Sequence, residues 1–202
     1  MIRTMYVLHP HDSVNEPFIL RQENPAGKLV VMDVYQDLIC PKCGKINEKI
    51  ALARGIQAGV VVKSKRPFLG SYDFFYLVDE RGKQVFSTVV PDQIDYYKIP
   101  SSNFYVASAK VWLEPEESNP GVEFARRRCK QCNRPGEVVW PRTNPLKVAH
   151  FQPFLSVNLE GGRGARETWV VSKEIADQLK KVSPPLTGIC LSPTKVDDGQ
   201  PV

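Results

Sequence analysis

Two pairs of cysteines constrain this chain more than any other feature of its sequence. Cys40 and Cys43 form one C-x-x-C pair, and Cys129 and Cys132 form a second. Such a pair has the right length to close a tight turn that directs two thiolates at one ion. Because zinc in structural sites takes four ligands in a tetrahedron, we predict one structural Zn²⁺ held by all four cysteines.

The residues that follow each pair fit this prediction. Gly44 follows the first pair and Asn133 follows the second, and these residue types tolerate the left-handed backbone conformation best. Lys45 and Arg134 come next in the two turns, and their charges would partly offset a site with four thiolates and one dication.

The spacing between the pairs is unusual for a zinc ribbon. Residues 44–128, which is 85 residues, separate the pairs, whereas compact ribbons separate theirs by roughly 15–20. An entire β-rich segment is therefore expected between the two turns. The pairs would meet if each turn lay at the end of a strand in one sheet.

Other roles for the cysteines stay open at this point. A redox dithiol at Cys40-Pro41-Lys42-Cys43 would gain a lowered thiol pKa from a following helix, but the hairpin pattern downstream does not supply the βαβ order of a thioredoxin-like fold. Two local disulfides would require an oxidising compartment. Cys190, in an apolar run, is expected to be a small buried hydrophobic residue, with a ligand role as the alternative.

The pattern of apolar residues predicts an α+β fold that is strand-rich, with a mostly antiparallel sheet and one or two short helices. Asp79-Glu80-Arg81-Gly82 is predicted to be a hairpin turn between strands 72–78 and 83–89. Gly55 is expected to end the first helix, and Ser172 to cap the second. The expected helices are 46–54 and 173–182. The other expected strands are 5–8, 28–39, 60–63, 104–113, 136–140, 147–157, 168–171 and 186–191.

We expect residues 1–202 to form a single domain, since this length suits one large domain. Within it, turns 40–45 and 129–134 would build a zinc-ribbon-like site that staples the fold, with a β-rich insert over 56–113. A C-terminal strand–helix–strand unit is expected over 167–191 and a loose tail over 192–202. Residues 114–121 and 160–166 are expected to be loops.

The apolar residues form no stretch that is typical of a targeting signal or a membrane span. The first ten residues lack the apolar stretch of a signal peptide, and no uninterrupted apolar run approaches the roughly 18 residues of a membrane span. We therefore expect a cytoplasmic protein without a membrane partner, in a compartment where paired cysteines hold metal more often than they form disulfides.

Five cations surround the second cysteine pair and are candidates for phosphate or partner contacts. They are Arg126, Arg127, Arg128, Lys130 and Arg134. A zinc ribbon that binds nucleic acid is therefore an alternative function. The formal net charge of +5 is mild for such a protein, and the simpler interpretation is that these side chains are solvated.

The sequence contains no constellation that argues for an enzyme. His9 and His11 flank a proline near the N-terminus, and His150 has no nucleophile that can be paired with it from sequence. The common phosphate-binding, metalloprotease and hydrolase motifs do not occur. We therefore expect a binding protein that has no catalytic residues and no cofactor besides the structural zinc.

The order of features resembles a known family. A Cys-Pro-x-Cys-Gly pair comes early, a second C-x-x-C comes past mid-chain, and a C-terminal unit runs from Trp169 through Ser172 to Gly188 and Ile189. This order is similar to that of the double-CXXCG motif proteins, which occur as paralogues in myxobacteria, some of them immunity proteins of polymorphic toxins. The chain departs from the family at Asn133, where the family has glycine.

The resemblance implies a cytoplasmic protein that binds and neutralises a cognate bacterial toxin. Its four cysteines would then shape the fold, while a variable surface would recognise the protein partner. A thiol–disulfide redox protein remains the third alternative, after the nucleic-acid-binding ribbon.

Overall fold

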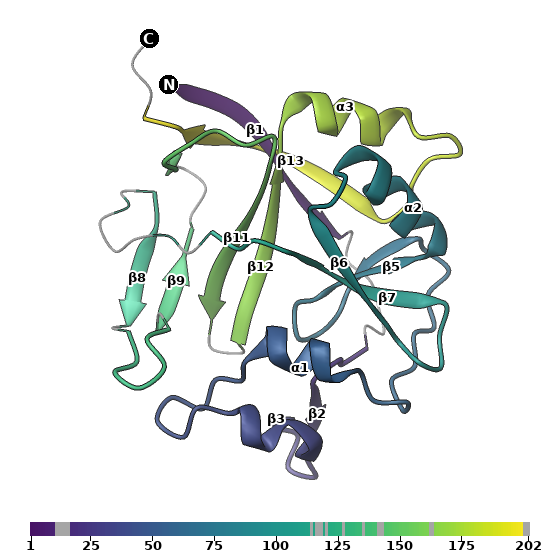
Figure 1. The fold of residues 1–202 in the computed structure, drawn as a ribbon, viewed down its shortest axis with the longest axis vertical. Coiled ribbons are helices and arrows are strands. Elements are labelled where there is room, and N and C mark those ends of the chain that lie inside the picture. Colours follow the sequence, from purple (N-terminus) through teal and green to yellow (C-terminus); the bar gives the residue numbers. More distant parts are fainter. Residues whose placement is uncertain are drawn as a thin grey trace.

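The computed structural model describes residues 1–10, 17–113, 115, 119, 121–126, 128–134, 136–140, 144–161 and 164–199. Figure 1 shows sheets that lie against one another, with short helices on the outside. The strand-rich α+β class with mostly antiparallel sheets is confirmed. Within the described part of the chain, none of the helices is both long and apolar enough to traverse a bilayer.

A five-stranded sheet at the centre joins the two ends of the described chain (Figure 1). Its order is β10-β13-β1-β12-β11, antiparallel except between β10 and β13. The first strand pairs with two strands from the C-terminal part, so that Leu8 lies opposite both Trp169 and Leu191. The strands are β1 Ile2–Pro10, β10 Leu146–Lys147, β11 Phe154–Gly161, β12 Gly164–Val171 and β13 Ile189–Asp197.

A four-stranded antiparallel sheet, in the order β4-β5-β7-β6, packs against one face of the central sheet. Trp169 is fully buried between the sheets, among Phe68, Tyr76 and Phe86. Two helices, α2 Glu80–Val89 and α3 Lys173–Lys181, close this core. The strands are β4 Phe68–Gly70, β5 Tyr76–Asp79, β6 Ile94–Lys98 and β7 Phe104–Ala109.

Each sheet carries a further cover on its outer face. The segment with the hairpin β2 Arg21–Glu23 and β3 Leu29–Val31, the 3₁₀ helix η1 Asp33–Leu38 and helix α1 Glu48–Arg54 covers the four-stranded sheet around Leu77. The hairpin of β8 Glu123–Arg126 and β9 Glu137–Val139 covers the central sheet around Val157. The first cysteine turn lies in the first cover, and the second turn lies between β8 and β9.

The predicted hairpin over 72–89 is wrong. Residues 80–89 form α2, because the Asp79 side chain accepts a hydrogen bond from the Gly82 N–H at 2.8 Å and caps a helix where a turn was expected. Val85, Phe86 and Val89 then lie at helical spacing and face the core. The expected β-rich insert 56–113 therefore contains a helix.

The predicted loose tail over 192–202 is wrong for residues 192–197, which continue β13. Val196 is fully buried, and the strand pairs with β1 along its whole length. The C-terminal strand–helix–strand unit therefore extends beyond 167–191, from Gly164 to Asp197. The pattern of apolar residues did not predict a strand here because Pro193, Lys195 and Asp197 alternate with inward residues, so that the segment contains few apolar side chains.

Smaller differences have the same cause, which is that tertiary pairing overrides local propensity. The expected strand 28–39 ends at Val31 and is followed by η1, and residues 60–63 pair with no strand in the part of the chain that the structure describes. The described part of the expected loop 160–166 belongs to the hairpin of β11 and β12. Helix α1 is ended by Gly55, and helix α3 begins after Ser172, as predicted.

Candidate metal centre

The first cysteine turn is closed by two backbone hydrogen bonds. The Cys40 N–H donates to the Lys45 carbonyl, and the Gly44 N–H donates to the Cys40 carbonyl, both at 2.8 Å. Gly44 has φ +72°, the left-handed conformation that lets the chain fold back. A bridge between Ile39 and Ile46 holds the ends of the turn together.

The second turn repeats the first, bond for bond. The Cys129 N–H donates to the Arg134 carbonyl and the Asn133 N–H donates to the Cys129 carbonyl, again at 2.8 Å. Asn133 has φ 56°, so it takes the left-handed role that Gly44 has in the first turn. Two segments 89 residues apart therefore have the same local geometry.

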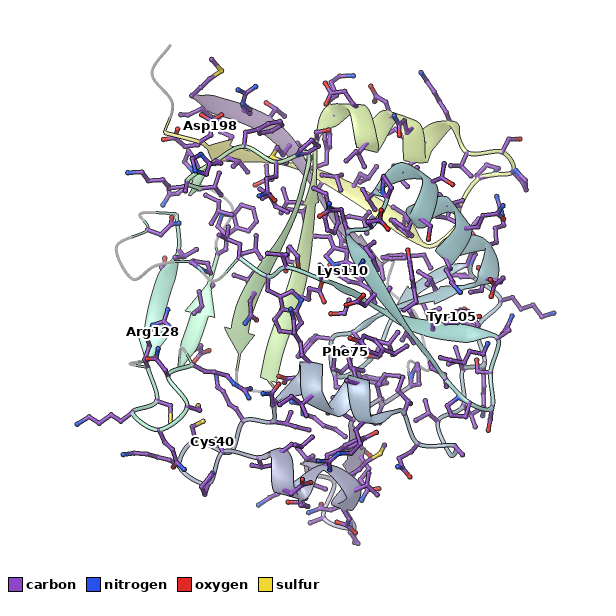
Figure 2. All side chains as sticks on the ribbon, viewed as in Figure 1. Cys40, Phe75, Tyr105, Lys110, Arg128 and Asp198 are labelled. Atoms are coloured by element: carbon purple, nitrogen blue, oxygen red, sulfur yellow. The ribbon has the colours of Figure 1, made fainter. Side chains whose placement is uncertain are left out.

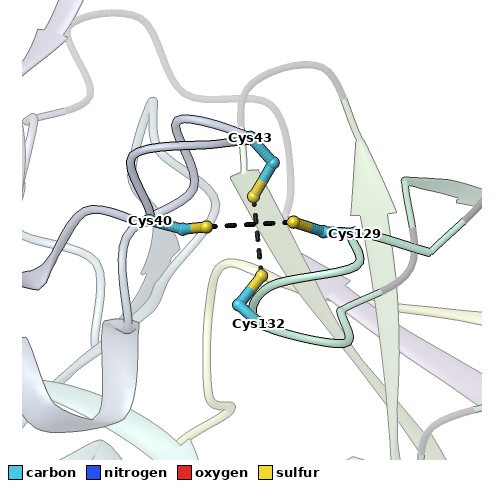
Figure 3. A group of neighbouring side chains, drawn as sticks. All are labelled: Cys40, Cys43, Cys129 and Cys132. Carbon is cyan, nitrogen blue, oxygen red and sulfur yellow. Dashed lines mark hydrogen bonds between the residues drawn. The ribbon is translucent and has the colours of Figure 1, made fainter.

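The two turns meet face to face and bring all four sulfurs together (Figure 3). The Sγ atoms of Cys40 and Cys129 are 3.8 Å apart, those of Cys43 and Cys132 are 3.5 Å apart, and all four lie within 4.8 Å of one another. A tetrahedron with Zn–S bonds of about 2.3 Å has sulfurs separated by roughly 3.8 Å. These separations suit thiolates around one ion and are far longer than a disulfide bond of about 2.05 Å.

The pairing of equivalent cysteines makes the centre two-fold in character. The first cysteine of one turn faces the first cysteine of the other, and the second faces the second. The four thiols, one buried, two half-buried and one exposed, lie at the edge of the molecule.

Backbone N–H groups stabilise one thiolate in each turn. The N–H of Cys43 lowers the pKa of Cys40, and the N–H groups of Cys132 and Gln131 lower the pKa of Cys129 to about 6. Although the Cys43 side chain is exposed, loss of hydration around its sulfur, together with the neighbouring thiols, raises the pKa of Cys43 to about 12. Four thiolates this close together repel one another, and a divalent metal would supply the charge that balances them.

Two cations cross between the turns in a reciprocal manner. Lys45 Nζ donates to the Gly136 carbonyl beside the second turn at 2.8 Å, and Arg134 Nη1 donates to the Ile46 carbonyl beside the first turn. Lys45 and Arg134 occupy equivalent positions, each five residues after the first cysteine of its pair. The two turns are therefore joined by protein contacts as well as by the sulfurs.

A buried carboxylate anchors Arg134 to the first cover. Glu48 is 3% exposed, and its Oε2 lies 3.3 Å from Arg134 Nη1 while its Oε1 lies 3.3 Å from Arg21 Nη2. Sequence reasoning missed Glu48. Its position in the first turn of an amphipathic helix, four residues before buried Leu52, was the available signal.

The predicted cation cluster divides between the fold and the solvent. Arg134 is committed to Glu48 and Ile46, while Arg128 donates to the Asn133 carbonyl at 2.9 Å and supports the second turn (Figure 2). Lys130 is exposed. The side chain of Arg126 and the whole of Arg127 lie outside the described residues.

The other residues considered from the sequence lie away from this centre. His9 Nε2 is 2.9 Å from Ser192 Oγ, and His9 pairs with Cys190 across β1 and β13. Cys190 is half-buried and His150 is exposed; His11 lies outside the described residues. Among the residues described, the four paired cysteines form the group able to hold a metal, and it includes neither histidines nor Cys190.

Comparison of the chain with protein-family models, with curated proteins and with solved structures finds no match. The chemistry of the four-cysteine cluster therefore carries the functional argument.

Proposed function

We propose that the four cysteines hold a structural zinc ion and that the protein acts by binding another protein. The observation that carries the metal assignment is the set of sulfur separations, which match a tetrahedral tetrathiolate. Soft thiolate ligands in this geometry select zinc or iron. Since four thiolates fill all four positions of zinc, no coordination site remains for a substrate, which supports a structural role.

The partner that we propose is a bacterial toxin, which the protein would neutralise in the cytoplasm. The resemblance to double-CXXCG proteins supports this role, and so does a centre whose ligands are all used for the fold. Two of the three described cations beside the second turn are engaged internally, which leaves fewer charges for phosphate contacts than the sequence suggested.

Zinc content tests the metal assignment first. We expect one zinc per chain by elemental mass spectrometry after purification without chelators or a metal-affinity tag, and loss of that zinc in a Cys129→Ser, Cys132→Ser variant. Cys190→Ser is the matched control and is expected to keep its zinc, because Cys190 lies outside the cluster. A metal-free wild-type protein that folds cooperatively would contradict the assignment. Iron in place of zinc would keep the site but change the metal.

A partner screen tests the binding role. Two tagged proteins would be expressed in the source cells and recovered after cross-linking. One is the wild type, and the other is a variant in which Cys129 and Cys132 are replaced while the surface lysines are unchanged. With the wild-type protein, we expect to recover a toxin whose gene lies beside the gene of this protein. Co-expression of the toxin and this protein is expected to rescue growth. Recovery of nucleic acid instead, with affinity that falls steeply as salt rises, would overturn the proposal.

A further inference from the structure

A pocket of about 440 Å³ lies beside the second cysteine turn, where four segments meet. The start of α1, the residues after β7, strand β11 and the second turn each contribute to its wall. This volume is within the range of pockets that hold small molecules, and it is too small for a folded partner. The side chains used below are Glu48, Lys49, Lys110, Trp112, Arg134 and Asn158.

Two polar atoms in the wall of the pocket are buried without a partner. Asn158 is 3% exposed, and its Oδ1 has no hydrogen-bond partner among the described residues; the same holds for Trp112 Nε1. Both atoms are shielded from bulk water, and leaving buried polar groups unpaired is unfavourable. One atom is an acceptor and the other a donor, so a ligand that satisfies both must offer a donor and an acceptor.

The charges around the pocket favour an anion. Arg134 and Glu48 balance each other at 3.3 Å, whereas Lys49 and Lys110 have no acidic partner among the described residues. Lys49 Nζ donates to the Lys110 carbonyl at 2.9 Å and lies 4.7 Å from the centre of the Trp112 ring. Lys110 is exposed at the rim of the pocket, and its label lies near the middle of the view in Figure 2.

We propose that this pocket binds a small phosphorylated compound that also carries a hydroxyl or amino group, such as a sugar phosphate or a mononucleotide. A phosphate has enough oxygens to accept from Lys49, Lys110 and the Trp112 indole at once, and lysine is a frequent phosphate ligand. The hydroxyl or amino group donates to Asn158 Oδ1. Because the indole N–H and Asn158 Oδ1 are both covered in the free protein, binding shifts the side chains that cover them, including that of Trp112. The inference depends neither on the metal nor on the toxin.

Trp112 provides the readout. Three indole N–H signals are expected in a ¹⁵N correlation spectrum, and only that of Trp112 lacks an acceptor, since Trp140 donates to Asn144 and Trp169 donates to Glu167. The full-length protein is titrated with ribose 5-phosphate, adenosine monophosphate and inorganic phosphate. The Trp112 indole, assigned with Trp112→Phe, and the Asn158 amide are expected to shift with saturation for at least one of the two organic phosphates.

Two charge variants decide whether the shifts report this pocket. Lys110→Gln is expected to weaken the affinity roughly tenfold. Lys195 is exposed on β13, three strands from β11, and Lys195→Gln is expected to leave the affinity unchanged. Lys110 is exposed, so its variant keeps the fold. The proposal is overturned by an absence of saturable shifts at millimolar ligand. Equal affinity in both variants, or shifts with inorganic phosphate that are spread over exposed lysines, would overturn it too.

Discussion

Gly44 and Asn133 have the same backbone conformation at equivalent positions of the two turns, with φ values of +72° and 56°. A Cβ at Gly44 would meet nothing within 4 Å. Any effect of a methyl group there therefore comes from backbone strain and not from a clash. The asparagine shows that the position accepts a side chain when that side chain tolerates the left-handed region.

Gly44→Ala is expected to lower the free energy of unfolding by about 1–2 kcal/mol, because alanine is strained at positive φ. Gly59→Ala is the matched control. Its Cβ also meets nothing within 4 Å and its φ is not positive, so we expect no loss and a gain of up to about 1 kcal/mol. Urea unfolding of the metal-loaded proteins measures both, and equal effects at the two glycines would contradict the conformational argument.

Glu167 is the buried carboxylate that joins the two main sheets. It accepts hydrogen bonds from Ala109 N at 2.6 Å, Trp169 Nε1 at 2.5 Å, and the hydroxyls of Ser156 and Ser108 at 2.9 and 3.0 Å. Burial raises its pKa despite these donors. Sequence reasoning passed over it. The available signal was that Glu167 lies on the same inward face of the strand as Trp169 and Val171, since these residues are spaced two apart.

Glu167→Gln is expected to make stability less dependent on pH. Since the folded protein binds this proton more tightly than the unfolded chain does, the stabilisation is fully present below the ordinary glutamate pKa of about 4.3 and is lost as pH rises through the raised folded value. Glutamine keeps the accepting oxygen for three donors and donates to Ser108. The test compares unfolding free energies of both proteins from pH 4 to pH 8; parallel curves would refute the expectation.

At the scale of elements, the two helix boundaries that were predicted well have local causes. Ser172 and Gly55 act through their own side chain or backbone, so the sequence alone is sufficient to place them. Asp79 was assigned to a turn because Asp-Glu-Arg-Gly also suits a hairpin. Whether Asp79 begins a helix or a hairpin turn depends on the packing of Phe86 in the core between the sheets. No local sequence pattern contains that information.

Residues 192–197 of strand β13 were missed for the same reason, and they give an element-level prediction. Val196→Ala is expected to lower the unfolding free energy by about 2 kcal/mol, because the fully buried valine projects from the outer face of the central sheet into the core beneath the hairpin of β8 and β9. Lys195→Ala, exposed on the same strand, is expected to change it by less than about 0.5 kcal/mol. A small effect at Val196 in thermal or urea unfolding would mean that the last strand contributes little.

On the scale of the whole molecule, the cysteine centre connects the two outer covers. The first turn belongs to the cover of the four-stranded sheet, and the second belongs to the cover of the central sheet. The four ligands were predictable because chelation is encoded in the spacing within each pair. Their meeting was not, since it requires both covers to end at one edge of the molecule. The pocket beside the second turn was invisible to sequence for the same reason.

Metal removal is therefore expected to destabilise the whole molecule. By analogy with a covalent cross-link, an ion that ties residues 89 apart contributes roughly 4–5 kcal/mol through loop-closure entropy, a large share of a typical total of about 5–15 kcal/mol. Urea unfolding with and without a strong chelator measures this, and restoration by added zinc is the control. Superimposable curves would show that the Lys45 and Arg134 contacts hold the covers without the ion.

The separation of paired segments along the chain has a consequence for biosynthesis. At about 5–20 residues per second, a ribosome needs roughly 4–18 s to extend from Cys40 to Cys129, residues that are 89 apart. During that time the first two thiols wait without their partners, open to oxidants and to competing metals. Strand β1 waits longer, because its neighbours β12 and β13 are made after residue 163. The strands of the four-stranded sheet, all within residues 68–109, are therefore complete before β1 has either of its neighbours.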